Sequence, residues 1–136
     1  MEKSFKPLHQ SIQQSCLEWS ATCDDSDFLE LTAVFIFEAE FAGFRGHFPG
    51  RPILPAMVQL ASVRFLAETG LEQLVYPVSY SRTKFRGIIQ PYEKVIMQVR
   101  LKRKDAGWTG TFSIEKGEGE RVTSGACTFS NTNRGE

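Results

Sequence analysis

The chain has 136 residues, of which 41% are hydrophobic and 24% are charged, and this suits one globular domain with its own core. Sixteen Lys and Arg balance sixteen Asp and Glu, so the sequence excludes the strong overall basic charge that favours nucleic-acid or anionic-membrane binding. No apolar stretch reaches the length of a membrane span and the N-terminus shows no leader pattern, so we expect a cytoplasmic protein.

The cysteines and aromatic residues bear on what the interior contains. Cys16, Cys23 and Cys127 are widely spaced, with no C-x-x-C pair and no histidine at metal-ligand spacing. They predict free thiols in a reducing compartment and no metal site. Eleven Phe in so short a chain indicate a wide apolar interior.

The first half of the chain predicts strands followed by a proline-rich loop. Residues 11–22 carry a weak pattern that we interpret as a first strand. Residues 29–41 alternate clearly, and this predicts a long strand with a Phe-rich inner face that forms core and can also line a ligand. The apolar positions of this strand are Leu29, Leu31, Ala33, Phe35, Phe37, Ala39 and Phe41. Prolines at positions 49, 52 and 55 then exclude a helix interior or central strand over 43–55.

The second half predicts one helix and four strands. Residues 56–69 contain no helix breaker and are apolar on most sides, which indicates a buried helix with Gly70 as its C-cap. Period-two segments follow at 76–89, 94–103, 108–115 and 121–129, joined by short turns that favour antiparallel neighbours. We therefore predict a single α+β domain over 1–130, in which an antiparallel sheet of five to six strands wraps around one long central helix. Residues 131–136 form a polar tail that we expect to be disordered.

The most informative segment is Gly46-His47-Phe48-Pro49-Gly50-Arg51-Pro52-Ile53-Leu54-Pro55-Ala56. It resembles the signature of the 3-hydroxyacyl-(acyl carrier protein) dehydratases, G-H-F-P-G-x-P-x-x-P-G, at ten of eleven positions. Lys84-Phe85-Arg86 and Pro91-Tyr92-Glu93 are similar to a later strand and turn of that family. Ile53-Leu54-Pro55 and Gln59-Leu60 are similar to its branch associated with aryl polyene synthesis. The resemblance implies a hot-dog fold.

The loop and the helix start suit chemistry on a thioester. Removing the weakly acidic proton beside a thioester carbonyl needs a positioned base and a donor that polarises the carbonyl oxygen. Histidine supplies a base near neutral pH, and the backbone N–H of Ala56 is free at the positive end of the predicted helix. The resemblance implies that His47 takes the C2 proton and that the Ala56 N–H contacts the carbonyl. A purely structural loop histidine is the alternative.

We expect the substrate pocket to follow the loop and the first turns of the helix. Its predicted residues are Phe48, Pro49, Gly50, Pro55, Met57, Gln59, Leu60 and Ala61. Ala61 departs from the family, which has a Glu or Asp there, supplied by the opposite subunit, to protonate the departing hydroxyl. Gln59 and Ser62 can orient a water, whereas Glu68 lies about two turns, roughly 10 Å, further along the helix. We assign no role to His9.

Basic side chains suggest a partner. Arg82, Lys84 and Arg86 recur at period two and, with Arg51, can contact an acidic acyl carrier protein and its phosphopantetheine phosphate. A solvated outer face is the alternative. The resemblance further implies a homodimer, or a heterodimer with a homologue, acting on an acyl carrier protein or CoA thioester. We expect no cofactor beyond the substrate's own phosphopantetheine, no nucleic acid and no membrane span.

Three functions follow from these observations. The first is dehydration of a 3-hydroxyacyl thioester with His47 as base and an unidentified proton donor. The second is an acyl-thioester-binding or partner subunit with impaired catalysis, which Ala61 favours. The third is thioester hydrolysis on the same fold, with His47 activating water.

Overall fold

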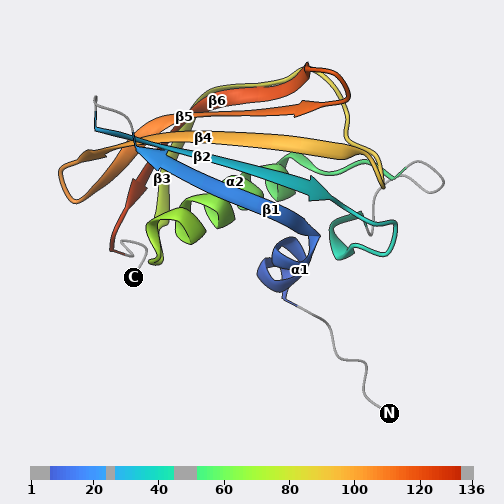
Figure 1. The fold of residues 1–136 in the computed structure, drawn as a ribbon, viewed down its shortest axis with the longest axis horizontal. Coiled ribbons are helices and arrows are strands. Elements are labelled where there is room, and N and C mark those ends of the chain that lie inside the picture. Colours follow the sequence, from blue (N-terminus) through green and yellow to red (C-terminus); the bar gives the residue numbers. More distant parts are fainter. Residues whose placement is uncertain (1–6, 24–26, 45–51, 133–136) are drawn as a thin grey trace, which may run out of the picture.

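The computed structural model describes residues 7–23, 27–44 and 52–132. The elements in chain order are α1 (Leu8–Ser15), β1 (Cys16–Cys23), β2 (Phe28–Ile36), η1 (Ala42–Phe44), α2 (Ala56–Leu71), β3 (Tyr76–Phe85), β4 (Lys94–Lys104), β5 (Gly107–Lys116) and β6 (Glu120–Ser130). The six strands of the described ranges form one sheet in the order β1-β2-β4-β5-β6-β3, with every neighbouring pair antiparallel. The sheet curves over α2 (Figure 1).

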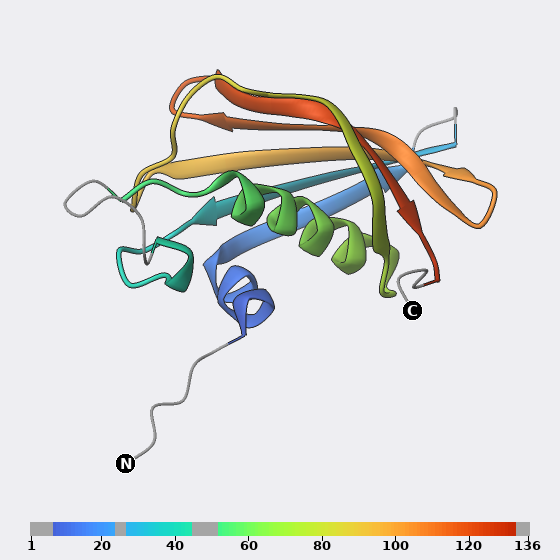
Figure 2. The ribbon, with the colours of Figure 1, turned by 180° about the vertical axis from the view of Figure 1, so that it is seen from behind.

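The α+β prediction of an antiparallel sheet around one long helix is confirmed. Seen from behind, α2 runs along the concave side of the sheet (Figure 2). Its apolar residues lie on most of its circumference, so the sheet can cover it on several sides. Its buried residues are Val58, Gln59, Ser62, Val63, Phe65, Leu66 and Ala67. No helix in the described ranges is long and apolar enough to cross a membrane.

The prediction that Gly70 caps the helix is wrong. The helix continues to Leu71, and Glu72 adopts the left-handed conformation, with φ 58° and ψ 38°, that ends it. Gly70 instead lies against the side chain of Leu31, where a Cβ atom would overlap both Leu31 methyl groups. Glycine is present because the helix approaches β2 closely, which is a packing reason that a sequence pattern does not reveal.

The Phe-rich strand is shorter than predicted. Its alternation is confirmed through Leu31, Ala33 and Phe35, all of which are buried, but β2 ends at Ile36 instead of continuing to residue 41. Phe37 and Phe41 stay buried after the strand ends because their rings pack against each other, with centroids 4.9 Å apart. Burial in an aromatic cluster therefore extends the apolar pattern beyond the strand.

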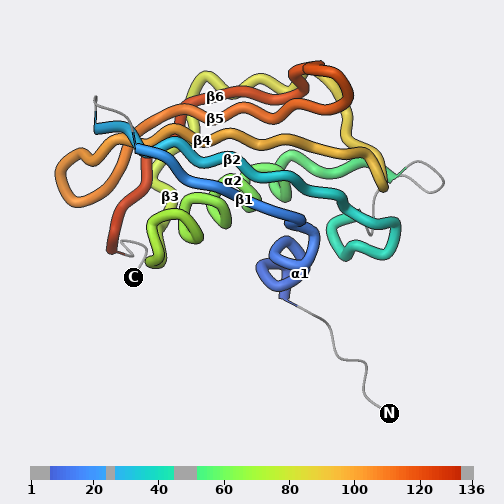
Figure 3. Tube along the Cα trace, viewed as in Figure 1, coloured from blue at the N-terminus to red at the C-terminus, as the bar shows by residue number. Residues whose placement is uncertain are grey.

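The predicted first strand over 11–22 is wrong at its beginning. Residues Leu8–Ser15 form α1, and β1 begins directly at Cys16, with no loop between them (Figure 3). Ile12 is the anchor of this helix, since only 1% of it is exposed. One buried apolar side chain in a polar segment is too little for a recognisable helical period.

The chain after β6 is described only as far as residue 132. Asn131 donates its backbone N–H to the Ala106 carbonyl at 2.9 Å, and Thr132 donates to the Ser130 hydroxyl at 3.1 Å. Asn131 and Thr132, the two described residues of the predicted tail, thus have hydrogen-bonded amides. Residues 133–136 lie outside the described residues.

Candidate functional site

The site begins where the chain enters α2. Pro55 is the N-cap residue, with φ −65° and ψ 155°, and its carbonyl accepts the N–H groups of Val58 and Gln59, each at 3.1 Å. Because Ala56 is the first residue of α2, no carbonyl earlier in the helix can accept its backbone N–H. Among the described residues, this N–H has no hydrogen-bond acceptor. Ala56 and Met57 are exposed, and 82% of Met57 is accessible. An exposed amide at the positive end of a helix can bind an oxygen that carries developing negative charge.

The predicted site residues His47, Phe48, Pro49, Gly50 and Arg51, in the first part of the signature segment, lie outside the described residues. The segment is described again from Pro52, and the backbone N–H of Leu54 donates to the Ile89 carbonyl at 2.8 Å. The end of the loop is thus fixed to the segment that follows β3, two residues before Ala56.

Gln59 connects this loop end to the sheet. Its amide nitrogen donates to the Leu54 carbonyl at 3.1 Å, and its amide oxygen accepts the hydroxyl of Thr123 on β6. Gln59 is only 4% exposed and Thr123 is fully buried. Because both ends of the amide are engaged, the side chain stabilises the approach to Ala56.

We expect Gln59→Leu to lower the free energy of unfolding by about 2–4 kcal/mol, because it leaves a buried carbonyl and a buried hydroxyl without their partner. Urea unfolding of the purified chain measures this loss. The double variant Gln59→Leu, Thr123→Val should recover part of it, since the orphaned hydroxyl is then absent as well. A single variant as stable as the wild type would show that the Gln59 amide is not needed for stability.

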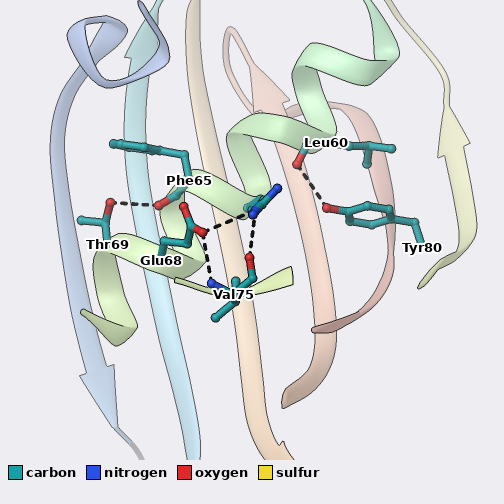
Figure 4. Close-up of polar contacts among 7 residues, drawn as sticks. Leu60, Phe65, Glu68, Thr69, Val75 and Tyr80 are labelled. Carbon is teal, nitrogen blue, oxygen red and sulfur yellow. Dashed lines mark hydrogen bonds and ion pairs between the residues drawn. The ribbon is translucent and has the colours of Figure 1, made fainter. Parts of the chain in front are cut away.

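Leu60 and Ala61 lie on the next turn and differ in their surroundings. The Leu60 carbonyl accepts the hydroxyl of Tyr80 on β3 at 3.4 Å (Figure 4). Ala61 is half-buried and lines a cavity of about 370 Å³ between α1 and α2. The predicted pocket residues on α2 therefore do not all face one space.

Glu68, which also lines this cavity, belongs to a structural network. One of its carboxylate oxygens accepts the backbone N–H of Val75 at 3.1 Å and lies 3.4 Å from the Arg64 guanidinium (Figure 4). Arg64 in turn donates to the Val75 carbonyl at 2.9 Å. With only 10% of its side chain exposed, Glu68 fixes the segment that leads into β3.

Two of the predicted basic residues, Arg82 and Lys84, lie on β3, and Arg86 follows it directly. Arg82 has a positive φ of 50° and sits at an irregularity in the β3–β6 register, which interrupts the period-two alternation assumed from the sequence. Arg82, Lys84 and Arg86 nevertheless all line one hollow of about 710 Å³. Arg121 of β6 also lines this hollow, and its Nη2 atom lies 3.8 Å from Oε2 of Glu115.

Burial changes the acidity of two side chains near α2. Desolvation raises the pKa of Tyr80 to about 12, and its neighbour Cys127 adds in the same direction. Burial also raises the pKa of the Cys127 thiol to about 12. Both groups are therefore neutral near pH 7, which suits packing and the donated hydrogen bond to Leu60. Among the described residues, no group of three His, Cys, Asp or Glu side chains could hold a metal ion.

Sequence reasoning missed three residues around α2, namely His9, Tyr80 and Thr123. Tyr80 and Thr123 lie on strands that pair with each other and reach α2 through tertiary contacts. For His9 a weak signal exists, because Leu8 and Ile12 are spaced by four residues and share a helix face with it.

One helix wrapped by a six-stranded antiparallel sheet, with an exposed amide at the helix start, defines a hot-dog domain. The ApeI-like family model, described as ApeI dehydratase, matches residues 23–126, which is most of the chain. The chain therefore belongs to the ApeI-like family. This confirms the resemblance inferred from the segment around His47.

Curated relatives agree with this membership. The 3-hydroxyacyl-[acyl-carrier-protein] dehydratase FabZ of Bartonella quintana is 34% identical over 87 residues, which cover 58% of this chain and 56% of that protein. The FabZ of Yersinia enterocolitica is 30% identical over 108 residues, covering 73% of this chain and 63% of that protein. The chain thus spans only about three fifths of the length of the relatives it matches.

Solved structures share the fold. The dehydratase heterocomplex ApeI:P from Xenorhabdus doucetiae superposes with a TM-score of 0.69 at 21% identity, covering 85% of this chain and 96% of that chain. A putative thioesterase from Lactococcus lactis gives 0.66 at 11% identity, covering 90% and 95%. At these identities the likeness establishes the fold alone.

Proposed function

We propose that the chain dehydrates a 3-hydroxyacyl thioester, with His47 as the base and the backbone N–H of Ala56 as the donor to the thioester carbonyl. The single observation that carries this proposal is that Ala56, at the start of α2, is an exposed residue whose amide has no partner among the described residues. Ala56 is the last residue of the segment that resembles the dehydratase signature. Family membership and the FabZ relatives support the same reaction.

In the proposed reaction, His47 removes the C2 proton while the Ala56 amide stabilises the negative charge that develops on the carbonyl oxygen. The electrons of the broken C2–H bond form the C2=C3 double bond. The C3–O bond breaks, and the hydroxyl leaves as water after it gains a proton. Fixing of Leu54 by Ile89 and by Gln59 supports a rigid approach to the amide.

A second candidate is an acyl-thioester-binding partner subunit with impaired catalysis. The observation that favours it is Ala61, whose side chain ends at Cβ on the wall of the cavity between α1 and α2 and holds no proton. One structural neighbour, moreover, is a dehydratase heterocomplex. Thioester hydrolysis, the third reading, has support from neighbours that share the fold alone.

The proposed partners are a second hot-dog subunit and an acidic carrier protein. Strand β3 is at one end of the sheet, and large apolar side chains on it and within three residues of its ends are exposed. They are Leu74, Val78, Phe85 and Ile88. An edge strand flanked by exposed apolar groups suits burial against another subunit, identical or homologous.

The hollow beside Arg82, Lys84 and Arg86 would suit the acidic carrier protein that delivers the thioester, with CoA as the other thioester carrier.

The purified full-length chain, incubated with 3-hydroxyacyl and enoyl pantetheine thioesters, tests these readings through its products. We expect interconversion of the two thioesters by the wild type, followed by absorbance of the conjugated enoyl group. Activity that is absent in the wild type and gained in Ala61→Glu would instead support the partner-subunit reading. Release of free acid would support hydrolysis.

A further inference from the structure

The hollow of about 710 Å³ lies on the sheet, and no residue of α2 is among the described residues that line it. Leu31 of β2 faces α2, because Gly70 of that helix lies against the Leu31 side chain. Successive side chains of a strand point to opposite faces of the sheet. Glu30 and Thr32, which both line the hollow, therefore point away from α2. The hollow is thus on the face of the sheet that α2 does not cover.

The register of the strands explains why this face is hollowed. One polar row crosses five strands, with each member paired to the next: Thr32, Gln98, Ser113, Ser124 and Lys84. All five residues line the hollow. Ser113 and Ser124 are short and form its floor, whereas the longer Gln98 and Lys84 rise on either side of them. The floor therefore presents hydroxyl groups, which can donate hydrogen bonds to a bound anion.

Cationic side chains surround this floor, and two of them have an acidic neighbour. Oε2 of Glu30 lies 3.5 Å from Nε of Arg100. Oε2 of Glu115 lies 3.8 Å from Nη2 of Arg121. Three further cations of the hollow form no ion pair within the described part of the chain. They are Arg82, Lys84 and Arg86. The hollow is thus a locally positive site on a chain whose formal net charge is zero.

An irregularity in β3 contributes one of these cations. Two residues of β3, Arg82 and Thr83, stand opposite the single residue Gly125 of β6. A Cβ atom on Gly125 would lie 2.8 Å from Oγ1 of Thr83, so Thr83 occupies the space beside that glycine. Arg82, with a positive φ of 50°, is therefore the extra residue, and its side chain lines the hollow together with Lys84. A bulge of this kind re-aims a side chain and is often found beside a functional site.

The donors of the hollow suit phosphate oxygens. Arginine guanidinium groups bind phosphate through two parallel hydrogen bonds, and the hydroxyl floor adds further donors. One phosphate group carries about 1.5–2 negative charges near pH 7, so two linked groups are needed to balance three unpaired cations. The volume lies within the range of small-molecule sites, which is roughly 300–1,000 Å³. A small molecule can reach a floor recessed between long side chains, whereas the broad surface of a protein contacts mainly the rim.

We propose that the hollow binds a small molecule that carries a diphosphate group. Arg82, Lys84 and Arg86 hold its phosphate oxygens, and the hydroxyls of Ser113 and Ser124 donate to them from the floor. This inference goes beyond the proposed function, since the site is on the other face of the sheet from α2 and takes no part in the thioester reaction. It also gives the hollow an occupant different from the acidic carrier protein considered above.

Isothermal titration of the purified full-length chain with pyrophosphate, ADP and AMP, all at one ionic strength, tests the proposal. We expect one saturable site per chain for pyrophosphate or ADP, and binding of AMP weaker than that of ADP by about tenfold or more. The same ligands should raise the melting temperature, because they bind the folded chain. Preference for pyrophosphate would indicate an inorganic ligand, and preference for ADP an organic diphosphate.

The double variant Lys84→Gln, Arg86→Gln removes two cations and leaves the bulge at Arg82 intact. It should weaken binding by about tenfold or more, because charge-assisted hydrogen bonds are lost. Lys104→Gln is the matched control, since Lys104 is an exposed cation at the end of β4 that does not line the hollow. It should bind as the wild type does. Melting temperatures without ligand check that both variants are folded.

Four results would overturn this inference. The first is the absence of a saturable site for pyrophosphate and ADP in the wild type. The second is unchanged affinity in the folded double variant, or an equal loss in Lys104→Gln, which would indicate general charge attraction. The third is AMP bound as tightly as ADP. The fourth is binding of acyl carrier protein that the double variant abolishes, with no binding of either diphosphate. The thioester assay is a separate measurement, so the proposed function can stand or fail independently of these results.

Discussion

Replacement of His47 by alanine is expected to lower kcat/KM for the thioester interconversion by about 10²–10⁴-fold, the usual contribution of a positioned general base. The reason is chemical, since alanine cannot accept the C2 proton. The melting temperature of the same variant separates loss of the base from loss of the folded state. Initial rates on the enoyl thioester, with thermal unfolding of the same preparations, measure both quantities.

His47→Asn provides the matched control for a structural histidine. Asparagine can still make side-chain hydrogen bonds but is no base near neutral pH. If His47 serves only to hold the loop, the asparagine variant should recover much of the activity lost in the alanine variant. Equal loss in both variants supports general-base catalysis, whereas full activity in either one would contradict it.

Ala56→Pro should lower kcat by about 10²–10³-fold, the usual effect of removing one donor from an oxyanion site. Proline lacks the backbone N–H, yet it is well tolerated at the first position of a helix. The preceding residue, Pro55, has ψ 155°, which is the extended conformation required before a proline. The substitution therefore removes the proposed donor while the helix start can be retained, and thermal unfolding should confirm that it is.

Ala56→Gly is the control for this substitution, because it keeps the N–H and introduces the residue of the dehydratase signature at this position. Its activity should equal or exceed that of the wild type, since a smaller residue leaves more room for the substrate. An active, folded Ala56→Pro variant would remove the amide from the proposed mechanism. So would a glycine variant impaired as much as the proline variant.

The fold could be predicted from the sequence wherever one periodicity dominates a segment. This holds for α2, for β4, β5 and β6 and for the first part of β2, whereas β3 ends at Phe85, four residues before the end of the predicted segment. It does not hold for α1, where Ile12 is the one buried apolar residue in a polar helix. It also fails at Phe37 and Phe41, which stay buried because of aromatic packing after the strand has ended.

The candidate site likewise has some features that the local sequence predicts and others that it does not. The exposed amide of Ala56 follows from a proline before a helix start, which is local information. The neighbourhood of His9 and Ala61 depends on how α1 packs against α2, and the partner of Gln59 depends on the register of β6. Such contacts between distant parts of the chain arise from tertiary structure, and one sequence read alone does not contain a pattern for them.

Because Cys16 follows Ser15 directly, α1 passes into the edge strand β1 without a loop. A loop would let the helix turn about its own axis, whereas here the phase of the helix is set by the strand, and each added residue turns it by about 100°. An insertion of one residue at this junction would rotate the His9 imidazole out of the cavity between α1 and α2. The spacing between residues 9 and 16 is thus a geometric constraint on sequence drift in this part of the chain.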